Sequence, residues 1–323
     1  MQGFWAKLKR PFFVLAPMAD VTDASFRRII ASFGKPDVMW TEFVSADGLF
    51  MGGQGALIKD LIFTEAERPI VAQFFSSRPR MMEQAARLAR ELGFDGIDIN
   101  MGCPDRSIEG QGAGAAHIKN PELALEVIAA AKAGAGDLPV SVKTRLGYNK
   151  DELETWLPKL LSARLAAITI HARTRKEMSK VPARWDRVAK AVEIRNELEA
   201  GGAHQTLILG NGDVRDLNAA RTVAQESGAD GVMLGRAIFG NPWLFSNREP
   251  QSISIPERLA ALKEHTLLYE ELLGDQKSFA IMKKHFKAYV NSWDGAAELR
   301  ARLMECTDAS GIAGVIDTEL ARY

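Results

Sequence analysis

The chain has 323 residues, of which 46% are hydrophobic and 25% are charged, and its 41 basic residues balance its 41 acidic residues. This composition is typical of a globular protein and argues against a largely disordered chain. The formal net charge of zero argues against a general nucleic-acid coat protein, although it leaves local basic patches open.

Short apolar runs recur along the first 236 residues, and helix-like segments separate them. The predicted strands are residues 12–16, 38–42, 69–75, 95–100, 139–144, 166–172, 205–211 and 230–236. Residues 81–93 and 121–134 between them show apolar spacings of three and four, with Gly93 and Gly134 as predicted C-terminal stops. Eight strands in strict alternation with helices predict an α/β fold, a closed parallel (β/α)8 TIM barrel.

The pattern changes after residue 247. Two prolines, Pro250 and Pro256, interrupt the chain, and from Glu257 onward only helical periodicity remains. We predict a barrel domain over residues 1–247 and a small C-terminal helical bundle over 253–323. Three amphipathic helices are expected in that bundle, with Gly274 and Gly295 between them.

Neither a membrane span nor a metal site is expected. The sequence has no run of 18 apolar residues, and residues 12–16 are too short for the apolar part of a signal peptide. Cys103 and Cys306 form no metal-type spacing and suggest no disulfide framework. We therefore expect a cytoplasmic, metal-free and monomeric protein.

Unusual polar residues and glycines follow the predicted strands, at the barrel end where active sites are found. In chain order they are Pro17, Met18, Ala19, Gln73, Asn100, Cys103, Lys143, Arg145, His171, Arg173, Arg175, Asn211, Gly212, Asp213, Gly235 and Arg236. One such residue would carry little information, but their repetition around the ring indicates a site.

The turns after the seventh and eighth strands are glycine-rich and are predicted to precede helices. Gly212 and Gly235 would let the backbone approach an anion closely, and Arg236 could add a charge-assisted contact. The alternative is that the GNGD segment, residues 210–213, is only a tight turn. Its pairing with LGR one strand later favours a phosphate site.

Three side chains suit a flat, electron-accepting heterocycle. Lys143 near the end of a buried strand is costly without an anion, and a reduced flavin gains negative charge at its pyrimidine edge. The alternative is a salt bridge to Asp98. His171 has no partner at metal-ligand spacing, so it is either a satisfied polar residue or a hydrogen-bonding contact to a cofactor. Gln73 offers both a donor and an acceptor.

Cys103 follows Gly102 and precedes Pro104, just past a buried strand. A free thiol has a pKa near 8.5, so it stays mostly protonated at pH 7 and is a usable proton donor. Nucleophilic catalysis would need an activating base, and no histidine occurs until His117. An inert small residue is the remaining alternative.

These motifs resemble the tRNA-dihydrouridine synthases, FMN enzymes that reduce particular uridines in tRNA with NADPH. The resemblance covers nearly the whole chain and includes APMADVTDASFR (16–27), NMGCP (100–104), GAGAA (112–116), VKTRLG (142–147), HARTR (171–175), GNGD (210–213), LGRA (234–237) and MKKHFKAYVNSWDGAAELR (282–300).

The resemblance implies a role for each matching position. Pro17, Met18 and Ala19 would lie against the isoalloxazine, while Gln73, Lys143 and His171 would hydrogen-bond FMN. The ribityl phosphate end would be held by Asn211, Gly212, Asp213, Gly235 and Arg236. Asn100 would orient the uracil, and Cys103 would protonate C5 after hydride addition at C6. NADPH would reduce the flavin in the same cleft, since the sequence has no Rossmann fingerprint.

Basic residues in the helical segment are candidates for RNA contacts. Lys283, Lys284 and Lys287 lie at helical spacing, and with Arg145, Arg173 and Arg175 they would bind the tRNA. By sequence alone, a solvated helix face is the alternative.

Two other functions are compatible with parts of this pattern. A barrel enzyme acting on a free pyrimidine, like the dihydroorotate dehydrogenases, explains the FMN turns and Cys103 but gives the helical segment no task. A barrel that binds RNA without catalysis predicts a colourless protein.

Overall fold

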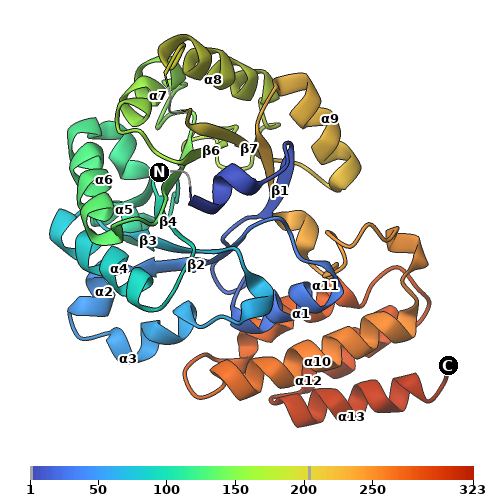
Figure 1. Cartoon of the computed structure of the whole chain (residues 1–323). Helices are drawn as coiled ribbons and strands as arrows, with labels where there is room; N and C mark the ends of the chain where they lie inside the picture. The colour runs from blue at the N-terminus through green and yellow to red at the C-terminus, as the bar shows by residue number, and fades with distance from the viewer. Residues whose placement is uncertain (1–2, 203–204) are drawn as a thin grey trace.

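Eight parallel strands form one sheet in this computed structural model, which describes residues 3–202 and 205–323. They are β1 (Phe12–Leu15), β2 (Met39–Ser45), β3 (Ile70–Phe75), β4 (Gly96–Asn100), β5 (Val140–Arg145), β6 (Ala167–His171), β7 (Leu207–Asn211) and β8 (Gly231–Leu234). The hydrogen-bonded order is β1-β8-β7-β6-β5-β4-β3-β2, and a parallel bridge between Val14 and Val38 brings β1 beside β2. The predicted barrel is confirmed, with all eight strands where the apolar runs placed them (Figure 1).

The strands are buried over almost their whole length, because helices cover the outside of the ring and side chains fill its inside. Every residue of β3, β4, β7 and β8 is buried. Such near-continuous apolar runs are typical of parallel strands covered on both faces.

Helices follow the strands in alternation. They are α1 (Ala24–Gly34), α2 (Ala46–Phe50), α3 (Gln54–Leu57), α4 (Pro79–Glu91), α5 (Arg106–Gly110), α6 (Pro121–Ala135), α7 (Leu153–Ser162), α8 (Trp185–Leu198) and α9 (Leu217–Ser227). Short 3-10 turns are η1 (Gly3–Lys7), η2 (Ile58–Leu61), η3 (Glu65–Glu67), η4 (Gly114–Lys119), η5 (Arg236–Ile238), η6 (Pro250–Ser252) and η7 (Phe279–Met282).

One predicted helix stop is right and the other is wrong. Gly93, with a φ of 83°, follows α4 as expected. Gly134 lies inside α6, and Gly136, with a φ of 62°, ends that helix. A Cβ at Gly134 would lie 2.1 Å from the carbonyl oxygen of Glu83, so this glycine permits close packing of α6 on α4.

Residues 253–323, all of which the structure describes, form four α-helices rather than the three predicted. They are α10 (Ile255–Leu273), α11 (Lys283–Tyr289), α12 (Ala296–Glu305) and α13 (Ala309–Leu320). The sequence of α13 contains Gly311 and Gly314, which lower helix propensity. Asp308 caps it by accepting from the Gly311 amide at 2.8 Å, and buried Ile312 and Ile316 lie on its inner side.

The helical segment packs directly on the barrel through α10 and α1, which lie side by side in Figure 1. Phe26 of α1 stacks on the ring of His265 at 4.7 Å between centroids, and one hydrophobic core runs from the barrel into α10, α11 and α12. The domain boundary between residues 247 and 253 therefore remains a prediction about folding units. Among the described residues, no helix combines the length and apolar character needed to cross a bilayer.

Candidate active site

A cleft of about 690 Å³ opens at the carboxyl ends of the strands. It lies at the barrel end where the sequence placed the site, and its volume lies in the range of small-molecule sites. Eleven of the predicted residues line it: Pro17, Met18, Lys143, Arg145, His171, Arg173, Asn211, Gly212, Asp213, Gly235 and Arg236. Ala19 is exposed and is not part of the lining.

Two arginines converge on Asp213 at one end of the cleft. Arg236 lies 2.8 Å from Asp213 Oδ1, and Arg173 forms an ion pair with Oδ2. The Arg173 contact holds the pKa of Asp213 below its ordinary value, so the carboxylate stays charged. Arg173 is only 2% exposed, and the structure therefore groups it with the residues predicted for the phosphate rather than with a solvent-facing RNA track.

The turn that carries Asp213 needs its glycines. Gly212 has a φ of 138°, and a Cβ there would lie 2.8 Å from the Cβ of Ala183. Gly210 faces Trp185, whose ring would lie 2.2 Å from an added Cβ. Trp185 in turn donates a hydrogen bond to the Gly212 carbonyl at 3.0 Å, so its side chain stabilises the turn.

Helix N-termini contribute less to this end of the cleft than the sequence predicted. The segment after β8 is the three-residue 3-10 turn η5, not a longer helix, and the first turn of α9 is already capped by the Asp216 side chain. The positive charge at this end therefore comes from the side chains of Arg173 and Arg236, both of which are paired with Asp213.

Lys143 reaches the cleft without the salt bridge that was considered for it. The Asp98 carboxylate accepts from Ser141 Oγ and Gln73 Nε2, both at 2.5 Å. No ion pair of Lys143 is found within the described ranges. Burial and the neighbouring Arg145 lower the pKa of Lys143 to about 8, although Asp98 and Cys103 act in the opposite direction. The Lys143 side chain lines the cleft.

His171 is neutral in the folded protein. Burial lowers its pKa to about 2, and the cations of Lys143, Arg145, Arg173 and Arg236 act in the same direction. Its Nε2 lies 3.3 Å from Arg173 Nη1, an interaction that requires the ring nitrogen to accept. The other ring nitrogen, Nδ1, then carries the proton and is the donor.

Gln73 and Asn100 lie beneath the cleft in a buried hydrogen-bond network. Gln73 donates to Asp98 and accepts from Asn100 Nδ2 at 3.2 Å. Asn100 Oδ1 accepts from the amides of Gly102 and Cys103 at 3.1 and 2.9 Å. In this structure Asn100 therefore shapes the backbone at Cys103, and neither amide lines the cleft.

Cys103 is partly exposed but is not among the residues that line the cleft. The preceding carbonyl, of Gly102, accepts from Arg145 Nε at 2.6 Å, and the Cys103 carbonyl accepts from the Ala115 amide at 2.9 Å. Gly114 permits this approach, because a Cβ there would lie 2.7 Å from the Cys103 carbonyl oxygen. The thiol packs on an apolar cluster of Phe75, Ile108 and Ala113.

That surrounding keeps the thiol protonated. Burial raises the pKa of Cys103 above its ordinary value. A hydrogen bond from the backbone of Asp105 and the charges of Arg145 and Lys143 oppose this increase, while the Asp105 carboxylate adds to it. The thiol is therefore an acid at neutral pH and a poor nucleophile.

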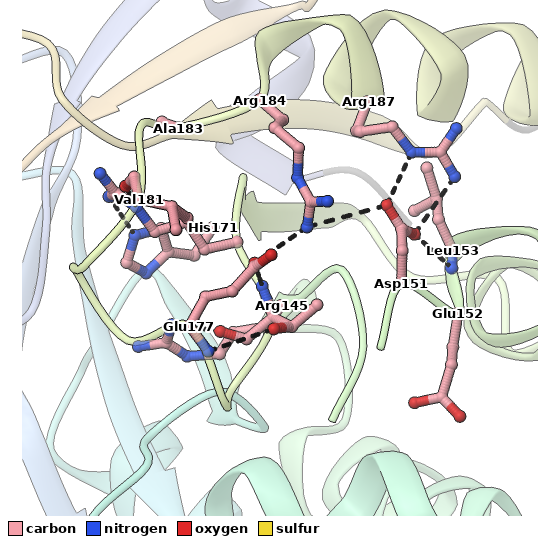
Figure 2. Close-up of polar contacts among 12 residues, drawn as sticks. Arg145, Asp151, Glu152, Leu153, His171, Glu177, Val181, Ala183, Arg184 and Arg187 are labelled. Atoms are coloured by element: carbon pink, nitrogen blue, oxygen red, sulfur yellow. Dashed lines mark hydrogen bonds and ion pairs between the residues drawn. The ribbon is translucent and has the colours of Figure 1, made fainter. Parts of the chain in front are cut away.

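Ion pairs join the loops after β5 and β6 at the rim of the cleft. Figure 2 shows Arg187, Asp151, Arg184 and Glu177 linked in series near His171. The distances are 2.8 Å from Arg187 Nε to Asp151 Oδ2, 3.9 Å from Arg184 Nη2 to the same oxygen, and 2.9 Å from Arg184 Nη2 to Glu177 Oε2. The network fixes the loop that contributes Met178 and Ser179 to the cleft.

A second, basic groove lies on the helical segment. Lys283, Lys284, Lys287 and Arg300 surround an apolar floor of Ala297, Ala301 and Met304. Lys283 Nζ donates to the Met304 carbonyl at 2.9 Å, whereas Lys284 and Lys287 are exposed. The three predicted lysines therefore share one surface, which we call the basic groove.

Residues 14–321 match the family model described as dihydrouridine synthase (Dus). The chain belongs to this family. A protein of Bacillus subtilis (strain 168) named "Probable tRNA-dihydrouridine synthase 2" is 40% identical, over 100% of this chain and 98% of its own length. A Staphylococcus epidermidis protein named "Probable tRNA-dihydrouridine synthase" is 40% identical, over 99% and 97%.

Solved structures support the fold. Morphinone reductase in complex with tetrahydroNAD aligns with a TM-score of 0.51 at 16% identity, over 75% of this chain and 87% of that one. A complex of 2-naphthoyl-CoA reductase with 2-naphthoyl-CoA gives a TM-score of 0.54 at 12% identity, over 72% and 49%. At this identity they show only the shared barrel.

The sequence analysis did not predict several residues that support the candidate site. Glu109, Asp151, Glu177 and Arg184 form ion pairs between loops, and Trp185 supports the GNGD turn. Charged residues in loops are frequent, so their sequence positions carried no signal. The close contact of Trp185 with Gly210 could have been suspected from a tryptophan that begins a helix next to a glycine-ended strand.

Proposed function

We propose that this chain reduces the 5,6 double bond of specific uridines in tRNA, with FMN as cofactor and NADPH as electron donor. Membership of the dihydrouridine synthase family, shown over residues 14–321, supports a flavin-dependent reductase that acts on tRNA. The finer assignments of FMN, NADPH and the residue roles are ours. Because tRNA is the substrate, we place the activity in the cytoplasm and expect a monomer to suffice.

The cleft fits a flavin mononucleotide. The observation that carries this is Lys143, which lines the cleft with no carboxylate of the described residues at ion-pair distance, in a wall shared with neutral His171. An anionic ring edge would neutralise the ammonium, and the imidazole would donate a hydrogen bond. At the other end, Arg173 and Arg236 would hold the phosphate, with Asp213 fixing both guanidinium groups.

When bound, the flavin supplies a hydride to C6 of the uracil. The residues of the chain manage the proton: Cys103 donates its thiol proton to C5, where the electron pair of the former double bond resides. The apolar wall of Phe75 and Ile108 keeps that thiol in its acid form until the transfer. The resulting thiolate is stabilised by Arg145 and Lys143 and takes up a proton from solvent afterwards.

The basic groove offers the RNA contact that this reaction needs. A uridine in folded tRNA must leave its stack to reach a barrel mouth, which costs a few kcal/mol. Phosphate contacts at Lys284 and Lys287 would offset that cost. Removing residues 253–323 is not a usable test, because α10 packs on α1 and the truncation would expose Phe26.

The test is the reaction itself with the whole chain. Purified protein is scanned for flavin absorbance and then supplied with NADPH and tRNA that lacks dihydrouridine, in parallel with free uracil and orotate. We expect a yellow protein that forms dihydrouridine in the tRNA only. Turnover of a free pyrimidine without tRNA would favour the dihydroorotate dehydrogenase-like alternative, and a colourless protein that binds tRNA would favour a non-enzymatic one.

A further inference from the structure

Three charged side chains, one buried and two partly buried, lie where the helical segment meets the barrel. Glu42, on β2, is 4% exposed, and its Oε2 accepts from Lys277 Nζ at 2.8 Å. Lys277 Nζ also lies 2.7 Å from Asp60 Oδ1. Lys277 follows α10, whereas both carboxylates belong to the barrel, so the ion pairs join segments more than 200 residues apart in the chain.

The second carboxylate oxygen of Glu42 contacts residues 16–23, which we call the cleft loop. Glu42 Oε1 accepts from the amide of Asp20 at 2.5 Å. Asp20 has a φ of 54°, a left-handed conformation that is uncommon for residues with a Cβ, although aspartate adopts it more readily than most. The hydrogen bond to Glu42 stabilises this conformation, because a carboxylate is a strong acceptor for a backbone amide.

Hydrogen bonds link residues 18–22 to one another, so the position of Asp20 influences the position of Met18. The Met18 carbonyl accepts from the amides of Val21 and Thr22 at 3.1 and 3.0 Å. Thr22 Oγ1 accepts from the Met18 amide at 2.9 Å. Met18 lines the cleft, and the hydrogen bond from Asp20 to Glu42 therefore fixes one of its walls.

Lys277 keeps Glu42 a good acceptor. Burial, together with the carboxylates of Asp60 and Asp23, raises the pKa of Glu42 to about 7, and Lys277 is the group that opposes this increase. Without this lysine the carboxyl group would take up a proton more readily, and a neutral carboxyl accepts a weaker hydrogen bond.

We propose that Glu42 is a positioning residue through which Lys277 of the helical segment fixes the cleft loop 16–23 against the flavin. The inference rests on the proposed flavin site and deepens it. The segment that carries the basic groove also holds one wall of the cleft, and loss of Lys277 loosens that wall although Lys277 does not line the cleft.

Hydrogen exchange of the loop amides in flavin-free protein, together with FMN affinity by fluorescence quenching, tests this. In Lys277→Met we expect exchange in 16–23 to be about tenfold faster and FMN binding about tenfold weaker, the loss of one charge-assisted hydrogen bond. Lys277→Arg should restore both, because it keeps the charge. Lys59→Met is the matched control, since it removes the exposed ion pair from Lys59 to Asp275 between the same two segments.

The inference is overturned if Lys277→Met exchanges in 16–23 like Lys59→Met, or if exchange rises equally throughout α1. Should Lys277→Met not fold, the double variant Glu42→Gln with Lys277→Met leaves no unpaired charge at position 42 and is measured in its place. If the parent protein binds no FMN, the proposed function fails, while the exchange data still decide whether Glu42 holds the loop.

Discussion

Arg175 holds Glu109 in a two-pronged ion pair, with Arg175 Nε at 2.9 Å from both carboxylate oxygens. The pair joins the loop after β6 to α5, the helix that begins three residues beyond Cys103. Glu109 is 8% exposed, and Arg175 also lies over the Tyr148 ring at 5.3 Å. The arginine predicted to bind RNA is thereby also part of the support for the Cys103 loop.

Glu109→Gln should loosen that loop. Breaking a partly buried charge-assisted pair costs about 1–3 kcal/mol locally, so we expect iodoacetamide to alkylate Cys103 several-fold faster, with FMN affinity unchanged. Glu83→Gln is the control, because it breaks an exposed ion pair with Arg87 on α4. Equal alkylation rates in the two variants would show that the ion pair does not restrain the thiol.

Cys103→Ala should separate the two halves of the reaction. We expect it to bind FMN and to consume NADPH in flavin reduction, but to form dihydrouridine about 10²- to 10⁴-fold more slowly, the usual contribution of a general acid. Cys306→Ala replaces the other cysteine, which lies between α12 and α13, and should behave like the parent. Product formation by Cys103→Ala at the parent rate would mean that another group supplies the proton.

The Cys103 thiol should titrate at higher pH than a free cysteine. Burial raises its pKa, so the reactive thiolate forms only at more alkaline pH. A pH profile of iodoacetamide alkylation of flavin-free Cys306→Ala protein measures the midpoint directly. A midpoint at or below that of a free thiol would contradict the acid role.

Lys284→Gln with Lys287→Gln should weaken tRNA binding without affecting FMN. Each lost phosphate contact should reduce the slope of log affinity against log salt by about 0.7–0.9. Filter binding over a series of salt concentrations measures this. Lys263→Gln is the control, because Lys263 on α10 is paired with Asp317 at 2.6 Å. An unchanged slope would assign the two lysines to an ordinary solvated helix face.

His265→Phe should make the protein more tolerant of acid. Burial lowers the pKa of His265 to about 3, and neither ring nitrogen has a hydrogen-bond partner among the described residues. The unfolded chain, with a histidine pKa near 6.5, binds a proton that the fold excludes. Stability is therefore complete above pH 6.5 and falls as the pH decreases toward 3, by about 1.4 kcal/mol per pH unit for this residue.

Urea unfolding at several pH values between 8 and 4 measures that dependence. A phenylalanine at position 265 can keep the stacking on Phe26 and binds no proton. The free energy of unfolding of the variant should therefore fall less steeply below pH 6.5 than that of the parent. At pH 8 the two proteins should differ little, because an unpaired polar group is replaced by an apolar one. Parallel curves for parent and variant would show that His265 is not the titrating group.

The sequence by itself determined the closed parallel barrel and the end of the barrel at which the candidate site lies. Eight apolar runs, each buried on both faces, can be satisfied only by a covered parallel sheet, and residues that follow successive strands must meet at one end of it. The position of Cys103 past the end of β4 followed from the same pattern. The sequence did not predict helix α13, because its glycines lower its helix propensity and packing on the neighbouring helices stabilises it.

Only the tertiary structure decided which of the collected side chains face the cleft and which are held by partners. Gln73 and Asn100 belong to the network of Asp98, Arg173 to Asp213, and Arg175 to Glu109, which lies 66 residues earlier in the chain. Sequence spacing places a residue on a strand end, but its partner comes from another loop of the closed ring. The partner of each side chain therefore depends on closure of the barrel. The Asp98 carboxylate, for example, is hydrogen-bonded by Ser141 and Gln73 and forms no direct ion pair with Lys143 among the described residues.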